Sequence, residues 1–182
     1  FLIWHKGIFI MATNLEFITS ASATSVTSLS IDNCFTDKYD VYLTIAEVSN
    51  VSSTFNNISY RYRNSSGDVS TTTYDYAHID LTAYTAFAQG RATNSTGLLA
   101  VQFADDVQGD VSEGIAYHFN PYDSSSYTFC TNQNNGQSSS GMFGRKGIGV
   151  EKTAQQITGI TVKSISGGAE TGDFDIKVYG VK

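Results

Sequence analysis

Apolar and polar residues alternate along most of this 182-residue chain with a period of two. Successive side chains of a β-strand point to opposite faces, so this period is typical of strands that bury one face. Turn-forming residues separate the runs, as in Asn64-Ser-Ser-Gly67 and Asn120-Pro-Tyr-Asp123. The pattern predicts strands over residues 15–19, 24–31, 39–48, 58–63, 68–76, 98–104, 115–119, 127–131, 142–152, 157–165 and 174–181.

Three regions need a separate interpretation. Residues 79–87 are rich in alanine and fit either a strand or a short helix. Residues 132–141 are almost entirely polar, which predicts a long loop. The last two alternating runs flank a glycine-rich segment at 167–172 and predict a closing β-hairpin.

The number and spacing of these runs predict an all-β fold, an antiparallel two-sheet β-sandwich of jelly-roll type. No stretch offers the crossover helix that a parallel sheet requires. Residues 14–182 are expected to form a single domain, since the chain is long enough for one core and short for two. The alternation places these side chains in the core: Val41, Leu43, Ile45, Leu99, Val101, Phe103, Ile148, Val150, Ile160, Val162, Ile176 and Val178.

The decapeptide Phe1–Ile10 differs from the rest of the chain because seven of its residues are large and apolar. At ten residues it is shorter than the roughly 20 apolar residues of a membrane-spanning helix. The codons of Lys6-Gly7 can form a bacterial ribosome-binding sequence at a normal distance from Met11. Residues 1–13 are therefore interpreted as a translated leader with the start at Met11, or as an apolar arm that docks on a neighbouring subunit.

Composition argues against several classes of partner. The net charge is −6, and the 11 basic residues are scattered, so neither nucleic acid nor an anionic membrane is an expected partner. Charged residues make up only 15% of the chain, and Ser, Thr, Asn and Gly replace them. These residues are poor helix formers, which strengthens the all-β prediction.

The sequence lacks the usual signatures of catalysis. Its three histidines, His5, His78 and His118, have no metal-ligand spacing, and no nucleophile stands in a recognisable motif. We therefore expect no enzymatic activity and no cofactor. An acidic loop carries four clustered carboxylates that are candidates for a calcium site, namely Asp105, Asp106, Asp110 and Glu113. The alternative is a solvent-exposed loop without a bound ion.

Aromatic residues and cysteines each leave two interpretations open. Tyrosines near predicted turns could stack on sugars of a glycan, or could lie at the ends of the sandwich with their hydroxyl groups in water. They are Tyr74, Tyr76, Tyr117, Tyr122 and Tyr127. Cys34 and Cys130 fit two small buried side chains, and a disulfide is the alternative.

Five segments in order resemble small virion structural proteins of tailed bacteriophages, especially marine and cyanobacterial ones. They are Leu15-Glu-Phe-Ile-Thr-Ser20, Cys34-Phe-Thr-Asp-Lys-Tyr-Asp-Val-Tyr42, Asn120-Pro-Tyr-Asp-Ser-Ser-Ser-Tyr-Thr-Phe129, Gly144-Arg-Lys-Gly-Ile-Gly-Val150 and Val178-Tyr-Gly-Val-Lys182. The resemblance implies a jelly-roll module in the virion, assembled in a bacterial host's cytoplasm. It also implies a homotrimer that contacts the major capsid protein or tail proteins. It assigns no catalytic residues to this chain.

The role within the virion has three alternatives. A tail-fibre head needs a coiled coil, a collagen-like run or a β-helix as its stem, and the sequence contains none, which favours a capsid decoration protein. A tail-fibre or tail-tip receptor-binding module is the first alternative, with a host surface glycan as partner. A lectin-like glycan-binding domain is the second. The 23 aromatic residues exceed what one small sandwich interior readily holds, which favours self-association.

Overall fold

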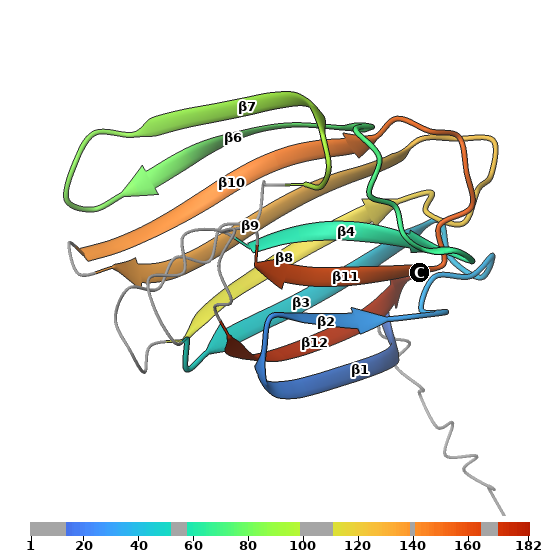
Figure 1. Cartoon of the computed structure of the whole chain (residues 1–182), viewed down its shortest axis with the longest axis horizontal. Coiled ribbons are helices and arrows are strands. Elements are labelled where there is room, and N and C mark those ends of the chain that lie inside the picture. Colours follow the sequence, from blue (N-terminus) through green and yellow to red (C-terminus); the bar gives the residue numbers. More distant parts are fainter. Residues whose placement is uncertain (1–13, 52–57, 99–110, 139–140, 165–170) are drawn as a thin grey trace, which may run out of the picture.

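A computed structural model describes residues 14–51, 58–98, 111–138, 141–164 and 171–182. These residues form β-strands joined by turns and loops, and they contain no helix (Figure 1). The strands are β1 (Leu15–Val26), β2 (Ser28–Ile31), β3 (Val41–Ser49), β4 (Ile58–Asn64), β5 (Gly67–Asp68), β6 (Tyr74–Thr82), β7 (Ala88–Ser95), β8 (Ser112–Phe119), β9 (Thr128–Ser138), β10 (Gly141–Glu151), β11 (Gly159–Ser164) and β12 (Gly172–Val181).

The strands form two antiparallel sheets. The larger has eight strands in the order β1-β12-β3-β8-β9-β10-β6-β7, and the smaller has four in the order β2-β11-β4-β5. In Figure 1 the small sheet lies over the half of the large sheet that contains β12, β3 and β8. The predicted all-β, two-sheet antiparallel β-sandwich of jelly-roll type is confirmed.

The core lies between the two sheets, and the small sheet follows the sequence pattern closely. Its inner face carries the bulky side chains of Ile58, Tyr60, Tyr62, Ile160 and Val162, which are all fully buried. The large sheet opposes them with β12, where Ile176 and Val178 are also fully buried. These four predicted aliphatic core positions, on β11 and β12, are therefore confirmed.

Other predicted core residues lie on the opposite face or outside the described residues. In β3 the side chains that face the core between the sheets are Tyr42, Thr44, Ala46 and Val48, whereas Val41, Leu43 and Ile45 lie on the outer side. The predicted burial of Leu43 is nevertheless confirmed, since it is only 6% exposed. In β10 Ile148 and Val150 also lie on the outer side, and Ile148 is 61% exposed. The physical reason on β10 is that the inner positions lie against large side chains, since a side-chain carbon at Gly149 would lie 2.5 Å from Leu98. Leu99, Val101 and Phe103 lie outside the described residues.

Two predictions of local structure were wrong, and one open choice is decided. Residues 79–82 belong to β6, so the strand is the correct alternative there; they lead through a turn into β7, which the alternation did not reveal. The polar residues 132–138 continue β9, because their backbone pairs with β10. The last two strands form no hairpin: β11 belongs to the small sheet and β12 to the large one. β11 pairs with β2 and β4, and β12 pairs with β1 and β3, all of which are distant in sequence.

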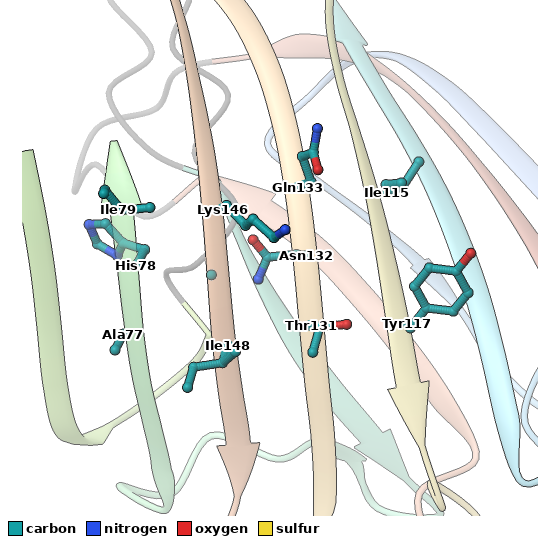
Figure 2. A pocket seen from close by; sticks show the side chains of 11 residues that line it. Ala77, His78, Ile79, Ile115, Tyr117, Thr131, Asn132, Gln133, Lys146 and Ile148 are labelled. Carbon is teal, nitrogen blue, oxygen red and sulfur yellow. The ribbon is translucent and has the colours of Figure 1, made fainter. Parts of the chain in front are cut away.

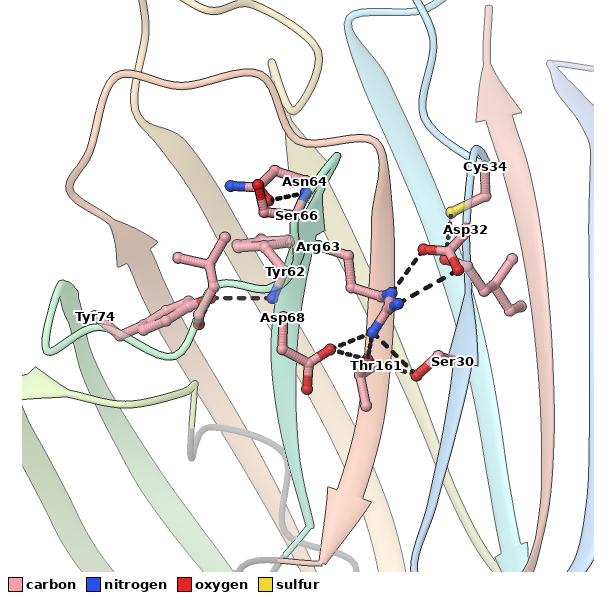
Figure 3. A network of polar contacts seen from close by, with 12 residues as sticks. Ser30, Asp32, Cys34, Tyr62, Arg63, Asn64, Ser66, Asp68, Tyr74 and Thr161 are labelled. Carbon is pink, nitrogen blue, oxygen red and sulfur yellow. Dashed lines mark hydrogen bonds and ion pairs between the residues drawn. The ribbon is translucent and has the colours of Figure 1, made fainter.

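A polar network joins the four strands of the small sheet on its outer face (Figure 3). The guanidinium of Arg63 on β4 donates to Asp32, which follows β2, and to Asp68 on β5. It also donates to the hydroxyls of Ser30 on β2 and Thr161 on β11. The outer face of the small sheet is therefore polar, with hydrogen bonds centred on Arg63.

Candidate functional site

The outer face of the large sheet is the candidate functional site, and it is unusually apolar. We use "outer face" for the surface that points away from the small sheet. Strand register aligns its side chains into rows that cross the sheet. The first outer row is Leu15, Val181, Val41, Phe119, Phe129 and Val150. The second outer row is Phe17, Tyr179, Leu43, Tyr117, Thr131, Ile148 and Ala77.

Many of these side chains are open to solvent. Phe17 is 57% exposed, Phe129 49% and Ile148 61%, and Leu15 and Tyr117 are exposed as well. An antiparallel sheet that faces water on one side normally shows polar residues there. The outer face of the small sheet follows that rule, with Ser28, Ser30, Arg61 and Arg63. The two outsides of the sandwich therefore differ in chemistry, and only one of them resembles a binding surface.

A shallow groove runs along the outer face over β6, β10, β9 and β8 (Figure 2). One part has a volume of about 460 Å³ and a second part about 470 Å³, and both are lined by Ala77, Thr131 and Ile148. Ile79, Ile115 and Tyr117 complete the apolar walls of the first part. The polar residues that line it are His78, Thr131, Asn132, Gln133 and Lys146, of which His78 and Asn132 are largely buried. A groove of this composition suits an apolar partner surface better than a hydroxyl-rich sugar.

Charged residues lie beside the apolar rows. The third outer row contains Lys177 on β12 and Lys146 on β10 together with Ile45, Ile115 and Ile79. The next row brings Asp175, Glu47 and Glu113 side by side on β12, β3 and β8. The Lys177 ammonium lies 2.9 Å from a carboxylate oxygen of Asp175. The outer face therefore has an apolar centre with charge along one side.

The five tyrosines predicted for glycan contact do not come together. Tyr74 is fully buried, and its hydroxyl donates to the carbonyl of Val69, so its assignment to a surface site was wrong. Tyr76 lies on the inner side of β6, where its ring stacks on His78. Tyr117 belongs to the outer face. Tyr122 and Tyr127 lie in the turn between β8 and β9.

The acidic loop predicted as a calcium candidate is only partly described. Asp105, Asp106 and Asp110 lie outside the described residues, and Glu113 is exposed on β8 opposite Glu47. Within residues 14–51, 58–98, 111–138, 141–164 and 171–182, no group of three or more His, Cys, Asp or Glu side chains could hold a metal ion. The same residues include no helix able to cross a membrane.

The cysteines are both buried and unbonded, as the first interpretation had it. Cys130 lies on β9 with its side chain toward the core, and Cys34 follows β2. Burial raises the pKa of each thiol to about 12. Thiol chemistry is therefore suppressed at both positions.

His118 is a fully buried titratable side chain in the core. Its Nε2 lies 3.0 Å from the hydroxyl oxygen of Thr44, and its Nδ1 lies 3.0 Å from that of Tyr62. The rings of Phe35, Tyr60 and Tyr62 surround it at 5.6–5.7 Å between centroids. Burial in this apolar setting lowers the pKa of His118 to about 3, so the imidazole is neutral and structural.

Sequence reasoning missed most of the outer face. It assigned Ile148 to the core and gave no role to Phe129, Ile79 or Ile115. The signal that could have found them is the composition of the alternate positions. On β9 and β10 these are Cys130, Asn132, Gly147 and Gly149, all small or polar, so the bulky residues between them point the other way.

No protein-family model matches the sequence, and no curated protein matches it. Solved structures with a similar course of the chain include a seed lectin isoform of Lotus tetragonolobus, at 12% identity over 96% of both chains with a TM-score of 0.35. The PL-14 alginate lyase of Aplysia kurodai shares 6% identity over 82% of this chain and 72% of that one, with a TM-score of 0.36. Peanut lectin shares 8% identity over 95% and 96%, with a TM-score of 0.27. Similarity at this level carries no functional argument.

Proposed function

We propose that this chain is a non-enzymatic structural protein of a tailed-phage particle, bound at the capsid surface as a decoration protein. The observation that carries the proposal is the apolar outer face, a surface that a protein normally covers with a partner. The sequence resemblance supplies the setting, and the outer face supplies a means of attachment within an assembly.

The chemistry of the groove supports assembly over catalysis or sugar binding. Ile79, Ile115 and Ile148 offer a sugar no hydrogen bonds, and Tyr117 is the only aromatic ring in the first part of the groove. General acid–base catalysis needs a titratable group beside the reacting atoms. Among the described residues, the ionisable side chains that line this part are His78, Tyr117 and Lys146, with no carboxylate among the lining residues. The outer face therefore suits a broad protein contact.

The number of copies and the location in the particle are also part of this proposal. The resemblance implies three copies in the assembly and contact with the major capsid protein. A tail-fibre or tail-tip position is the alternative location, where a host glycan would be the partner. These locations differ in copy number, because the capsid surface repeats many times and the tail tip does not.

Quantitative mass spectrometry of purified phage particles whose genome encodes this chain tests the proposal. We expect hundreds of copies per particle, in a fixed ratio to the major capsid protein. A handful of copies would place the protein at the tail and contradict the capsid location. Absence from particles, combined with binding of the isolated protein to a glycan array, would contradict the structural role and support a lectin.

A further inference from the structure

We infer that the outer face packs against the same face of a second copy of this chain. The inference deepens the proposed function by naming the partner of that surface, and it can fail independently of the capsid location. It rests on the size of the outer face, on its shape and on the distribution of charge around it.

The exposed apolar area matches one side of a protein–protein interface. In the first three outer rows, seven large apolar side chains are at least 37% exposed: Leu15, Phe17, Ile79, Ile115, Tyr117, Phe129 and Ile148. With large side chains of roughly 150–250 Å² each, these fractions leave on the order of 600 Å² of apolar surface in water. A standard interface buries about 800 Å² per partner, and apolar atoms make up roughly 60% of it. The outer face therefore carries enough apolar area for one stable dimer.

The shape of the surface favours an identical sheet as its partner. Neighbouring strands lie about 4.8 Å apart, so the eight strands present rows some 34 Å long. Two sheets pack face to face at about 10 Å when their side chains interdigitate. A second copy brings rows of the same spacing and bulk, and two such faces cover one another without a remaining gap.

The edges of the large sheet are less suited to self-association than its face. Pairing of β1 with β12 is interrupted between Phe17 and Thr19 and again between Ala23 and Val26. Irregularities of this kind twist an edge strand away from further pairing. At the other edge, β7 is irregular opposite Tyr74 and Tyr76. Addition of strands from another copy is therefore disfavoured at both edges.

Charged residues border the apolar part of the outer face on one side. Lys146 and Lys177 lie in the third outer row, and Asp175, Glu47 and Glu113 lie in the row beyond it. Protein interfaces commonly combine an apolar centre with a polar rim, and the outer face has this order. The charged side chains would remain hydrated at the rim when the exposed apolar side chains of the first three outer rows are buried.

The same geometry favours two copies over the three that the resemblance implies. Three sheets about 34 Å wide that all face a common axis meet only near their edges and leave an opening between their centres. Two sheets that face each other bury their centres fully. Phe129 and Ile148 lie on the neighbouring strands β9 and β10 and are 49% and 61% exposed, so we expect both within the contact.

Analytical ultracentrifugation of the full chain tests the inference with three variants. Ile148→Glu and Phe129→Glu each place a carboxylate among the exposed apolar side chains of the outer face. Ser28→Glu is the matched control, because it adds the same charge at an exposed position of the small sheet, opposite Lys163. A carboxylate without a partner in an apolar contact should weaken the dimer about 100-fold or more.

At tens of micromolar, the wild type and Ser28→Glu are expected at twice the chain mass of 19.7 kDa. Both outer-face variants are expected at one chain mass with an unchanged circular dichroism spectrum. A monomeric wild type, a three-chain assembly, or folded outer-face variants that stay dimeric would each overturn the inference. If one outer-face variant does not fold, the other decides. Particles that retain hundreds of copies of a monomeric protein would overturn the inference and leave the proposed function standing.

Discussion

Acidification from pH 7 to about pH 4.5 should lower the free energy of unfolding by about 2–3 kcal/mol through His118 alone. The imidazole is fully buried, and burial lowers its pKa from 6.5 to about 3 in the folded protein. In the unfolded chain the same side chain titrates at its ordinary value. Below pH 6.5 the unfolded state therefore binds a proton that the folded state does not bind.

The sign follows from this difference in proton binding. The stability from keeping His118 neutral is fully present above the unfolded pKa of 6.5 and is lost as pH falls toward 3. Between these values the loss approaches about 1.4 kcal/mol per pH unit. Side-chain hydrogen bonds from Lys152, Ser125 and Asn50 also lower the pKa of Asp75, Asp123 and Asp173, respectively.

Urea unfolding between pH 7 and 4.5 measures the effect, with two variants to separate its causes. His118→Gln removes the titration and should flatten the dependence of stability on pH in this range. Tyr62→Phe removes the hydroxyl that lies 3.0 Å from Nδ1 and should keep the dependence while lowering stability at every pH. A wild type and a His118→Gln variant with parallel pH profiles would show that His118 is not neutral by burial.

Ile176→Ala should cost about 3–4 kcal/mol of stability, whereas Ile148→Ala should cost less than about 0.5 kcal/mol. The alternation of the sequence assigns both isoleucines to the core. In the structure Ile176 lies on the inner side of β12 and is fully buried, and Ile148 lies on the outer face of β10. The same truncation therefore leaves a cavity at one position and removes exposed surface at the other.

Denaturant unfolding measures the free energy of unfolding of these two variants, at a protein concentration low enough to keep the chains monomeric. Val178→Ala, on the same side of β12 as Ile176, serves as a second core variant. Equal costs at Ile148 and Ile176 would mean that the two faces of the large sheet are assigned the wrong way round.

The sequence predicts the class of fold because strand alternation depends on local positions. Clear cases are Ile58, Tyr60 and Tyr62 on β4 and Ile160 and Val162 on β11, where bulky and polar residues alternate without ambiguity. Pairing is not local, so the same pattern joined β11 and β12 into a hairpin although they lie in different sheets. The polar β9 was missed because backbone pairing with β10, and not side-chain burial, makes it a strand.

The sequence did not predict the outer face because the more apolar side of a strand is normally expected to point inward. On β10 the inner positions include Gly147 and Gly149, and a side-chain carbon at Gly149 would lie 2.5 Å from Leu98. Large residues on the opposite side of the core require small ones here, so Ile148 points outward. Where both sides of a strand are uncharged, close packing across the core decides which side is inside.

The rate of thiol labelling at Ile148→Cys most directly tests whether the outer face is covered. The native Cys34 and Cys130 are buried and have a raised pKa, so the labelling rate that is measured comes from the introduced thiol. Ser28→Cys on the small sheet is the reference position. At tens of micromolar the thiol at position 148 should react about tenfold more slowly than the thiol at position 28, and dilution should close the gap. Equal rates at every concentration, for the isolated protein and for assembled particles, would contradict a covered outer face.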